Sequence, residues 1–404
     1  MSKFTTAQWE KVNELLENEG AKYGLPEQRT DSVVLSSFNI RKLGKVKSKS
    51  KGSWLFLKSF CERCDLLGIQ EVQDNLEGIN YLKGIMGDSF NMVASDITGK
   101  SPDGGGMSER QAFLYKWQTV ERTEVASDLT FDKTAVIDFI ADGWDDLKGV
   151  FEKYSKAYIK HKKAKAEKKK TKKPEIVLPS FLSFIRTPLC VSFRIKGFNH
   201  ADPYEFIGVN AHLLFGSKKK FEGKTERDRE FDALMKWLTW RAKQADKLYH
   251  KNLILFGDLN LNFEQVDTRR DEIEEMIKGY NRKYLRSKRA AKVNFPFLDV
   301  HPEREKAGVF RTNARLNQTY DQIGLFMHDK RLPNDKANDN AGKVEGEFNY
   351  GMFNFVDLFA NALYGNDYND LPESKKGLLV KKFEHDVSDH MPIWVRLPKP
   401  YAGM

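Results

Sequence analysis

The sequence predicts a layered α/β fold in one domain, because short apolar runs recur along its 404 residues with helical or loop stretches between them. The runs are rich in Val, Ile, Leu and Phe, and Asp, Asn, Gly or Pro bound them, which is typical of buried strands. Strands that alternate with helices favour sheets covered by helical layers. The predicted strands lie at residues 33–38, 66–69, 112–115, 190–195, 206–211, 253–256, 322–326 and 393–397.

Two of the intervening stretches predict amphipathic helices that would cover such sheets. Residues 226–249 carry Phe231, Leu234 and Leu238 among charged side chains, and residues 271–287 are similarly amphipathic. Apolar residues three and four positions apart share one face of a helix. We therefore expect both helices to pack that face against a sheet.

The N-terminal residues predict a polar amphipathic helix, with Trp9, Val12 and Leu16 on one side. They lack the uninterrupted apolar core of a secretory signal. No later stretch has the length of apolar sequence that spans a bilayer. We expect a cytoplasmic protein with no membrane partner, in which residues 1–30 form an N-terminal helical extension and residues 31–400 form the domain.

Residues 128–182 depart from the alternation of strands and helices and predict an insertion in the domain. Apolar residues from Val136 to Tyr158 follow one another in steps of four and three. They trace one face of a long helix that we expect to dock on the body, with Gly143 as a weak point. Residues 160–173 follow it and predict a mobile basic arm.

The arm holds most of the excess positive charge. Of the chain's net charge of +10, +8 lies in residues 160–173, where nine lysines face one glutamate, which leaves +2 for the rest. Such a patch suits the phosphate backbone of a nucleic acid, although a solubilising tether has the same composition. The expected nucleic-acid contacts are Lys162, Lys163, Lys169 and Lys170.

Polar residues able to hold a metal ion or move a proton stand at the ends of the predicted strands. Each alone has an ordinary structural explanation, as a turn, a helix cap or a hydrogen-bonded histidine. Their joint occurrence, at the places where layered α/β folds build sites, indicates a functional site. The residues are Asn39, Glu71, Glu109, His212, Asp258, Asn260, Asp321, Asp389 and His390.

These residue types suit the hydrolysis of a phosphodiester by water. The reaction adds negative charge to the non-bridging oxygens, so its site needs a cation, neutral donors such as Asn39 and Asn260, and a group that manages protons. A histidine paired with a carboxylate stays protonated nearer to neutral pH, which makes it an acid or an electrostatic clamp. Asp258 and the histidines are alternative acceptors for the proton of water.

In their order along the chain, the blocks FNIR, LLGIQEV, SERQ, NAH, GDLN, TYDQI and SDH resemble the endonuclease/exonuclease/phosphatase superfamily. FNIR, LLGIQEV, SERQ with AFLYK, and TYDQI resemble DNase I-like nucleases in particular. The resemblance extends over residues 33–397 and leaves out the N-terminal helix and the basic insertion. It implies a four-layer α/β/β/α sandwich with one cleft at an edge of the sheets, to which this chain adds an inserted helix and a basic arm.

The resemblance also implies a role for each residue of the site. Glu71 and Asn39 would hold Mg²⁺, or alternatively Mn²⁺, with Asp389 completing the metal environment. These oxygen ligands suit such a cation. Asp258 and Asn260 would position the scissile phosphate and the attacking water.

The histidines and arginines would contact the substrate. His212, oriented by Glu109, and His390, oriented by Asp321, would flank the phosphate. In DNase I-like nucleases, one arginine in the FNIR-type block and another just before a later strand face the DNA backbone. The matching arginines here are Arg41 and Arg186.

The implied activity is that of an endodeoxyribonuclease that hydrolyses DNA by in-line attack of water and leaves 5'-phosphate and 3'-hydroxyl ends. Met107 and Gln73 stand where the family has a tyrosine and an arginine that contact the minor groove. We therefore expect the basic arm to contact DNA in their place. The alternatives are a phosphatase or RNA-directed member of the same superfamily and, from another class, a non-catalytic nucleic-acid-binding protein. A regulatory protein or inhibitor is a further expected partner, and the oligomeric state is left open.

Overall fold

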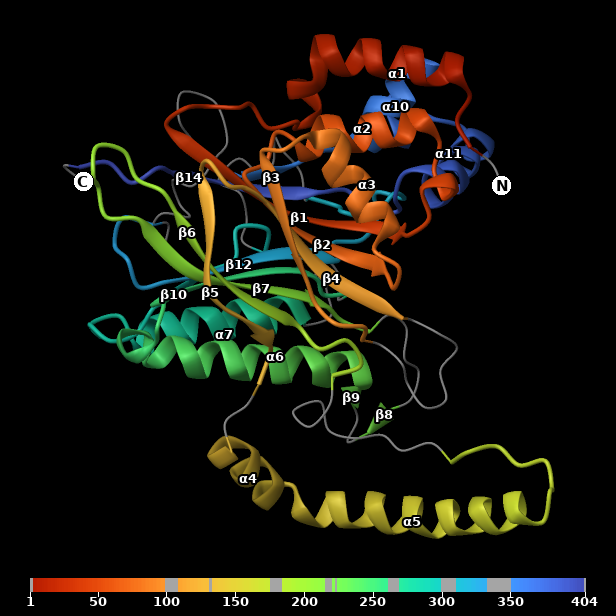
Figure 1. Cartoon of the computed structure of the whole chain (residues 1–404), viewed down its shortest axis with the longest axis vertical. Coiled ribbons are helices and arrows are strands. Elements are labelled where there is room, and N and C mark those ends of the chain that lie inside the picture. Colours follow the sequence, from red (N-terminus) through yellow and green to blue (C-terminus); the bar gives the residue numbers. More distant parts are fainter. Residues whose placement is uncertain are drawn as a thin grey trace.

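The computed structural model describes residues 3–98, 108–130, 133–174, 184–214, 220–221, 224–260, 269–298, 310–332 and 350–402. Within these residues, two six-stranded mixed sheets lie face to face, and helices cover the outer face of each (Figure 1). The predicted four-layer α/β/β/α sandwich is therefore confirmed. No helix among these residues is both long enough and apolar enough to cross a bilayer.

The first sheet has the strand order β13–β14–β1–β2–β4–β3. Its central strands β1 and β2 are parallel, whereas β14 pairs antiparallel with β1, and β4 antiparallel with β2. The strands are β1 (Ser32–Leu43), β2 (Leu66–Gln73), β3 (Phe90–Ala94), β4 (Glu109–Lys116), β13 (Tyr350–Met352) and β14 (Ile393–Pro398).

The second sheet has the order β11–β12–β10–β7–β6–β5, again with a parallel central pair, β10 and β7. A short hairpin of β8 (Lys220–Phe221) and β9 (Lys224–Thr225) lies outside both sheets. The six strands are β5 (Val120–Asp128), β6 (Leu189–Ile195), β7 (Tyr204–His212), β10 (Asn252–Asp258), β11 (Lys292–Asn294) and β12 (Asp321–Met327).

All eight predicted strands are present, and each lies in the interior of a sheet. Among the described residues, the four strands of the two sheets that the sequence did not predict are the edge strands β3, β5, β11 and β13. Apolar runs mark strands that are buried on both faces, whereas an edge strand is paired on one side and is often exposed. In β5, for example, most side chains are exposed. The edges therefore escape a search for apolar runs.

Side chains alternate between the two faces of each sheet and so build two kinds of core. In β10, Ile254 and Phe256 face the other sheet, whereas Leu253 and Leu255 face the helices. The sheets approach closely at Gly68 of β2, where a Cβ atom would lie 2.8 Å from the Cβ of Phe256. Aromatic side chains fill the space that such positions leave between the sheets.

Helices on each side supply the outer layers. The two predicted amphipathic helices, α6 and α7, cover the second sheet. Over the first sheet lie α2, α3, α10 and α11, and α1 packs on α10 and α2 (Figure 1). Their bounds are α1 (Thr6–Glu19), α2 (Lys51–Cys61), α3 (Glu77–Met86), α6 (Glu226–Lys243), α7 (Arg269–Lys283), α10 (Phe355–Tyr364) and α11 (Glu373–Asp386), with short 3₁₀ turns η1 (Gly20–Tyr23), η2 (Val46–Ser48), η3 (Ala245–Lys247) and η4 (Tyr368–Asp370).

The helix predicted near the N-terminus is α1, and it is part of the core instead of an appendage. Thr5 begins it with a capping box, in which its side chain accepts from the backbone N–H of Gln8. The rings of Phe4 and Trp9 lie 4.8 and 5.3 Å from that of Phe359 in α10. The aromatic cluster ties the first residues of the chain to its C-terminal helices.

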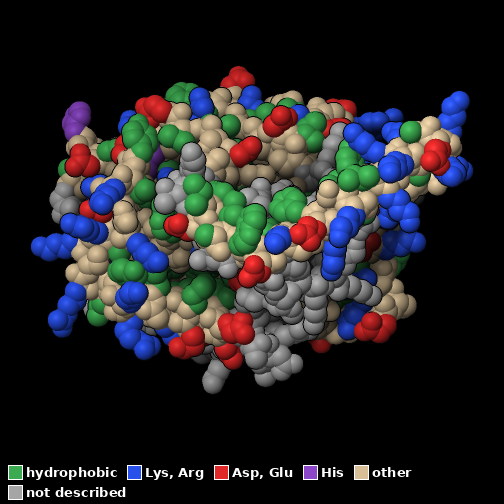
Figure 2. Space-filling model, turned by 90° about the horizontal axis from the view of Figure 1, so that it is seen from below, with side chains coloured by type: hydrophobic (Ala, Val, Ile, Leu, Met, Phe, Trp, Pro, Cys, Tyr) green, Lys and Arg blue, Asp and Glu red, His purple; other side chains and the backbone are tan. Residues whose placement is uncertain are grey.

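The insertion differs from its prediction in two ways. The single expected helix is two helices, α4 (Lys133–Asp142) and α5 (Trp144–Ala166), which Gly143 separates. The expected docking of α5 is not seen among the described residues: Trp144, Phe151 and Ile159 are 56%, 47% and 54% exposed, although Leu147 is buried, and α5 lies apart from the sheets (Figure 1). Figure 2, seen from the side on which α5 lies, shows hydrophobic side chains on this surface next to lysines and arginines. Periodicity predicts that a helix has an apolar face but not what covers that face.

The contrast between α1 and α5 predicts different costs for the loss of a tryptophan. Trp9→Ala should lower the free energy of unfolding by about 3–5 kcal/mol, because Trp9 is buried among aromatic rings. Its matched control, Trp144→Ala, should change that free energy by about 0.5 kcal/mol or less. Urea denaturation followed by circular dichroism measures both values. Equal costs would contradict the placement of the two helices.

Candidate active site

The register of the second sheet brings three predicted residues together. β10 pairs Asp258 with His212 of the parallel strand β7 and with Asp321 of the antiparallel strand β12. Residues two apart on a strand face the same side, so Asp258 follows Ile254 and Phe256 onto the face that meets the first sheet. The apolar layer between the sheets thus gives way to charged groups at this end.

Buried amides separate these charged groups from the apolar core. Gln70 Nε2 in β2 donates to Asn210 Oδ1 in β7 at 2.7 Å, which joins the two sheets. Asn210 Nδ2 donates in turn to the carbonyl oxygens of Ile69 and Ala112 at 3.1 and 2.9 Å. These hydrogen bonds offset part of the cost of burying the two amides, whereas Gln70 Oε1 has no partner among the described residues. The motifs do not include this pair, although an amide at an inward position of an apolar strand is a signal for such a role.

A bulge turns Glu71 toward the site. The pairing of β2 with each of its neighbours shifts register here, and Glu71 has a left-handed backbone with φ 58°. On a regular strand its side chain would face away from that of Gln70, so the strained conformation re-aims it. Glu71 Oε1 accepts from Asn39 Nδ2 at 3.2 Å, and its Oε2 accepts from the backbone N–H of Lys42 at 3.0 Å.

Asn39 connects carboxylates of the two sheets. Its Nδ2 donates to Asp258 Oδ2 at 2.8 Å as well as to Glu71 Oε1. The side chain is fully buried, and its Oδ1 has no hydrogen-bond partner among the described residues. A buried carbonyl oxygen without a donor costs about 1–3 kcal/mol. A cation bound to this oxygen would remove that cost.

Asp389 lies in the loop before β14, which Ser388 fastens to the end of β1. Ser388 Oγ donates to the carbonyl oxygen of Asn39 at 2.7 Å and accepts from the backbone N–H of Arg41 at 3.2 Å. Asp389 forms a short ion pair with the guanidinium of Arg41, and its Oδ1 is buried without a hydrogen-bond partner in the described part of the chain. Glu71, Asn39 and Asp389 thus offer a set of oxygen donors that fits a hard divalent cation.

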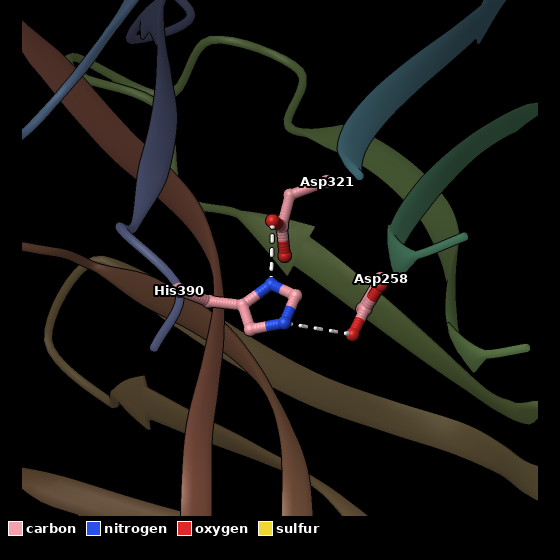
Figure 3. Close-up of side chains that lie close together, drawn as sticks. All are labelled: Asp258, Asp321 and His390. Atoms are coloured by element: carbon pink, nitrogen blue, oxygen red, sulfur yellow. Dashed lines mark hydrogen bonds and ion pairs between the residues drawn. The ribbon is translucent and has the colours of Figure 1, made fainter. Parts of the chain in front are cut away.

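His390 stands between two carboxylates (Figure 3). Its Nδ1 lies 2.9 Å from Asp321 Oδ2, and its Nε2 lies 3.6 Å from Asp258 Oδ2. Burial lowers the pKa of His390, but the charges of Asp321 and Asp258 outweigh it and hold that pKa well above the ordinary value. The three groups lie close enough to hold a metal ion. We interpret them instead as a hydrogen-bonded chain, because a protonated imidazole has no free lone pair for a metal.

His212 forms a matching pair on the other side of Asp258. Its Nε2 lies 3.5 Å from Asp258 Oδ2, and its Nδ1 lies 3.2 Å from Glu109 Oε2. Burial raises the pKa of Glu109, but His212 and Arg186 outweigh it and hold that pKa below the ordinary value. Both histidines are therefore backed by a buried carboxylate.

Arg186, for which the sequence predicts a contact with the DNA backbone, is buried in the cleft and paired with an acid. Its side chain is 2% exposed, and its Nε lies 2.8 Å from Glu109 Oε2. A second nitrogen donates to the carbonyl oxygen of Leu213 at 3.3 Å. This arginine lines the floor of the cleft and holds Glu109 in place. Sequence shows that an arginine precedes a strand, but not which acid it meets.

A tight turn ends β10 in the GDLN segment. Asp258 Oδ1 accepts from the backbone N–H of Asn260 at 3.0 Å, and Asn260 has φ 51°, which asparagine tolerates. Asn260 Nδ2 donates to the carbonyl oxygen of Leu213 at 2.9 Å, which ties the turn to the end of β7. The turn occupies Oδ1 of Asp258 and leaves Oδ2 to Asn39 and the histidines.

The site opens into a cleft of about 730 Å³. Asn39 and Asp321 are fully buried behind the groups that line it, and the predicted lysines lie elsewhere, on α5 and the segment after it. One wall was not predicted: it comes from Asn313, Arg315 and Tyr320, in a polar stretch without periodicity that could have placed it. The predicted residues that line the cleft are Arg41, Glu71, Glu109, Arg186, His212, Asp258, Asn260, Asp389 and His390.

No protein-family model and no curated protein matches the chain. Among solved structures it is similar to an endonuclease/exonuclease/phosphatase family protein from Bacteroides thetaiotaomicron, at 13% identity and a TM-score of 0.41 over 90% of this chain and 97% of that one. The human Nocturnin catalytic domain with bound sulfate has 12% identity and a TM-score of 0.42 over 92% and 94%. TDP2 of D. rerio, complexed with a single-strand DNA product, has 12% identity and a TM-score of 0.41 over 90% of this chain and 98% of that one.

The pair of His390 and Asp321 predicts a shift in titration. Asp321→Asn should lower the pKa of His390, because the substitution removes the charge that raises it and keeps a hydrogen-bond acceptor. The ion pair stabilises the fold while His390 is protonated, and this contribution is lost as pH rises through the folded-state pKa. In the variant that loss should occur at lower pH.

The measurement is an NMR titration of the imidazole rings in wild-type and variant protein. His250, whose pKa burial lowers, precedes the opposite end of β10 and serves as internal control. A His390 titration that does not move, with His250 also unchanged, would show that Asp321 does not hold the proton on this ring.

Proposed function

We propose that this chain is a divalent-metal-dependent phosphodiesterase of the endonuclease/exonuclease/phosphatase superfamily, with DNA as its preferred substrate. The observation that carries the proposal is the surrounding of Asp258 Oδ2, which lies 2.8 Å from Asn39 Nδ2, 3.5 Å from His212 Nε2 and 3.6 Å from His390 Nε2. An amide and two carboxylate-backed imidazoles thus meet one carboxylate at an open cleft. Such a set supplies the donors and proton-transfer groups that hydrolysis of a phosphate ester needs.

The cation would be held by Glu71 and Asn39, with Asp389 nearby, and Mg²⁺ is the proposed ion with Mn²⁺ as alternative. Bound there, it would stabilise negative charge on the phosphoryl oxygens as a Lewis acid. The donors are all oxygen atoms, and two of them lack a hydrogen-bond partner within the described chain. This chemistry favours a hard cation over zinc.

The side chains of the chain itself would do the remaining work. His390, held protonated by Asp321, would donate a hydrogen bond to a non-bridging oxygen, and His212 would face the phosphate from the other side. Asn260 would help to orient the scissile group for in-line attack of water, which leaves 5'-phosphate and 3'-hydroxyl ends. Because His390 already carries its proton, Asp258 and His212 are the candidate acceptors for the proton of water.

Positive charge outside the cleft supports a polymeric substrate. Arg41 is 25% exposed at the rim, beside Asp389. The lysines predicted as nucleic-acid contacts are exposed on and after α5. A small phosphorylated substrate needs no such extended basic surface, whereas a nucleic-acid backbone does. Cytoplasmic location and control by a protein inhibitor belong to the same proposal, since a nuclease that reaches cellular DNA needs restraint. The lysines are Lys162, Lys163, Lys169 and Lys170.

The test of activity compares wild-type protein with Glu71→Ala and with a matched control, Glu62→Ala, whose carboxylate pairs with Lys58 on the surface. The substrates are supercoiled plasmid, linear duplex, single-stranded DNA, RNA and an inositol polyphosphate, each with Mg²⁺, Mn²⁺ or EDTA. We expect metal-dependent cleavage of DNA that falls about a hundredfold or more in Glu71→Ala and stays unchanged in the control. The rise of the melting temperature with Mn²⁺ should disappear in the same variant.

Each other result selects a different function. Phosphate release from the inositol compound with intact plasmid would favour a phosphatase, and cleavage of RNA alone would favour an RNA-directed enzyme. Binding without cleavage of any substrate would favour a non-catalytic nucleic-acid-binding protein. Full activity in Glu71→Ala would refute the assignment of the metal site.

The lysine tract predicts a steep dependence of binding on salt. Replacing Lys162, Lys163, Lys169 and Lys170 by glutamine should reduce the slope of log binding constant against log salt concentration by about 3, because fewer counterions are released. The matched control replaces the same four by arginine and should keep the slope. Fluorescence anisotropy with labelled DNA between 50 and about 300 mM salt measures it. An unchanged slope would mean that the tract is a tether.

A further inference from the structure

A run of aromatic rings lies along α5 and has no part in the cleft. Tyr154, Tyr158 and His161 are spaced by four and three residues, so they share one face of the helix. The rings of Tyr154 and Tyr158 are 5.6 Å apart with an interplanar angle of 16°, and those of Tyr158 and His161 are 6.5 Å apart at 27°. The three rings form a nearly parallel stack along the helix axis.

Lysines flank this stack closely. Lys162 Nζ lies 5.4 Å above the ring of Tyr158, and Lys160 and Lys163 are exposed on the same turns. The neighbours of the rings in sequence, Phe151 and Ile159, are about half exposed. Among the described elements, no strand of either sheet lies against α5, and α4 is the helix that contacts it (Figure 1). The three rings themselves are half-buried, and exposed lysines surround them.

Parallel rings with adjacent cations suit one class of polyanion in particular. Unpaired bases expose their faces and stack on aromatic side chains, while lysines contact the phosphates between them. A duplex hides the faces of its bases and would use the lysines alone. A membrane surface favours a wedge of aliphatic and aromatic side chains with no need for ring alignment. The rings in the lysine-rich half of α5 are those of tyrosine and histidine, which have polar edges.

We propose that the carboxyl-terminal half of α5 binds single-stranded nucleic acid, with unpaired bases stacked on the Tyr154 end of the aromatic run, where Tyr158 backs the ring, and phosphates held by the flanking lysines. The inference rests on the proposed function and narrows its substrate to strands with unpaired segments, such as gaps, tails or melted regions. It also gives the insertion a role other than a general attraction to DNA, because stacking distinguishes strand states and charge alone does not.

The experiment measures binding in EDTA, where cleavage does not intervene. A fluorescein-labelled single strand of about 20 nucleotides, long enough for several binding sites of this kind, is compared with its duplex by anisotropy. The variant Tyr154→Ala/Tyr158→Ala is compared with the matched control Tyr154→Phe/Tyr158→Phe, which keeps the rings. We expect the alanine variant to bind the single strand about tenfold more weakly or worse, with duplex binding within about twofold, and the phenylalanine variant to match wild type.

Two readouts separate this inference from the proposed activity. Turnover of bis(p-nitrophenyl) phosphate with Mn²⁺ should be equal in wild type and both variants, and circular dichroism should show the same helix content. Two results would overturn the stacking site and leave the phosphodiesterase standing, provided that the small diester is turned over. One is equal affinity of the wild type for single strand and duplex, and the other is equal weakening of both affinities in the alanine variant. Selective binding of the single strand without turnover of any diester would support the stacking site and refute the phosphodiesterase activity. Binding to phosphatidylserine vesicles that is lost in the alanine variant, with oligonucleotide binding intact, would assign this face to a membrane and overturn the inference.

Discussion

The buried carboxylate of Asp258 is the constraint on which the rest of the site depends. It is 1% exposed, and an unpaired charge at such a position costs several kcal/mol. Partners from both sheets and from the loop before β14 therefore have to meet it, and each of the two histidines brings a carboxylate of its own. Acidic and basic groups alternate across the floor of the cleft. Their order is Asp321, His390, Asp258, His212 and Glu109, with Arg186 at the end.

This alternation of charges depends on strand register. The pairing of β7, β10 and β12 sets His212, Asp258 and Asp321 side by side, and a slip of one residue in any of these strands would turn its member to the helical side. The amides of Gln70 and Asn210 fasten the sheets to each other just beneath this layer. The polar layer is thereby held by the same two sheets whose apolar faces form the core, so stability and site geometry are coupled.

The support of the site extends to the first residues of the chain. Asp386, at the end of α11, accepts hydrogen bonds from the backbone N–H groups of Phe4 and Ser50 at 3.1 and 2.7 Å. Lys49, whose pKa burial lowers to about 8, donates to the carbonyl oxygen of Val387 at 2.5 Å. These contacts hold the loop that carries the proposed metal carboxylate and the protonated histidine. The segment that leads into the N-terminal helix is thus a structural support of the site, although it lies outside the motifs that indicate the site.

The sequence by itself determined the interior strands, the two helices of the second sheet and the polar residues that meet at the cleft, because period-two and period-3.6 patterns are local and both faces of an interior strand are buried. Only the tertiary structure decided how those residues point and what covers them. A bulge aims Glu71, an ion pair with a distant acid buries Arg186, and the aromatic face of α5 is left open. Each of these depends on a neighbour far along the chain, and a local pattern holds no information about such a neighbour.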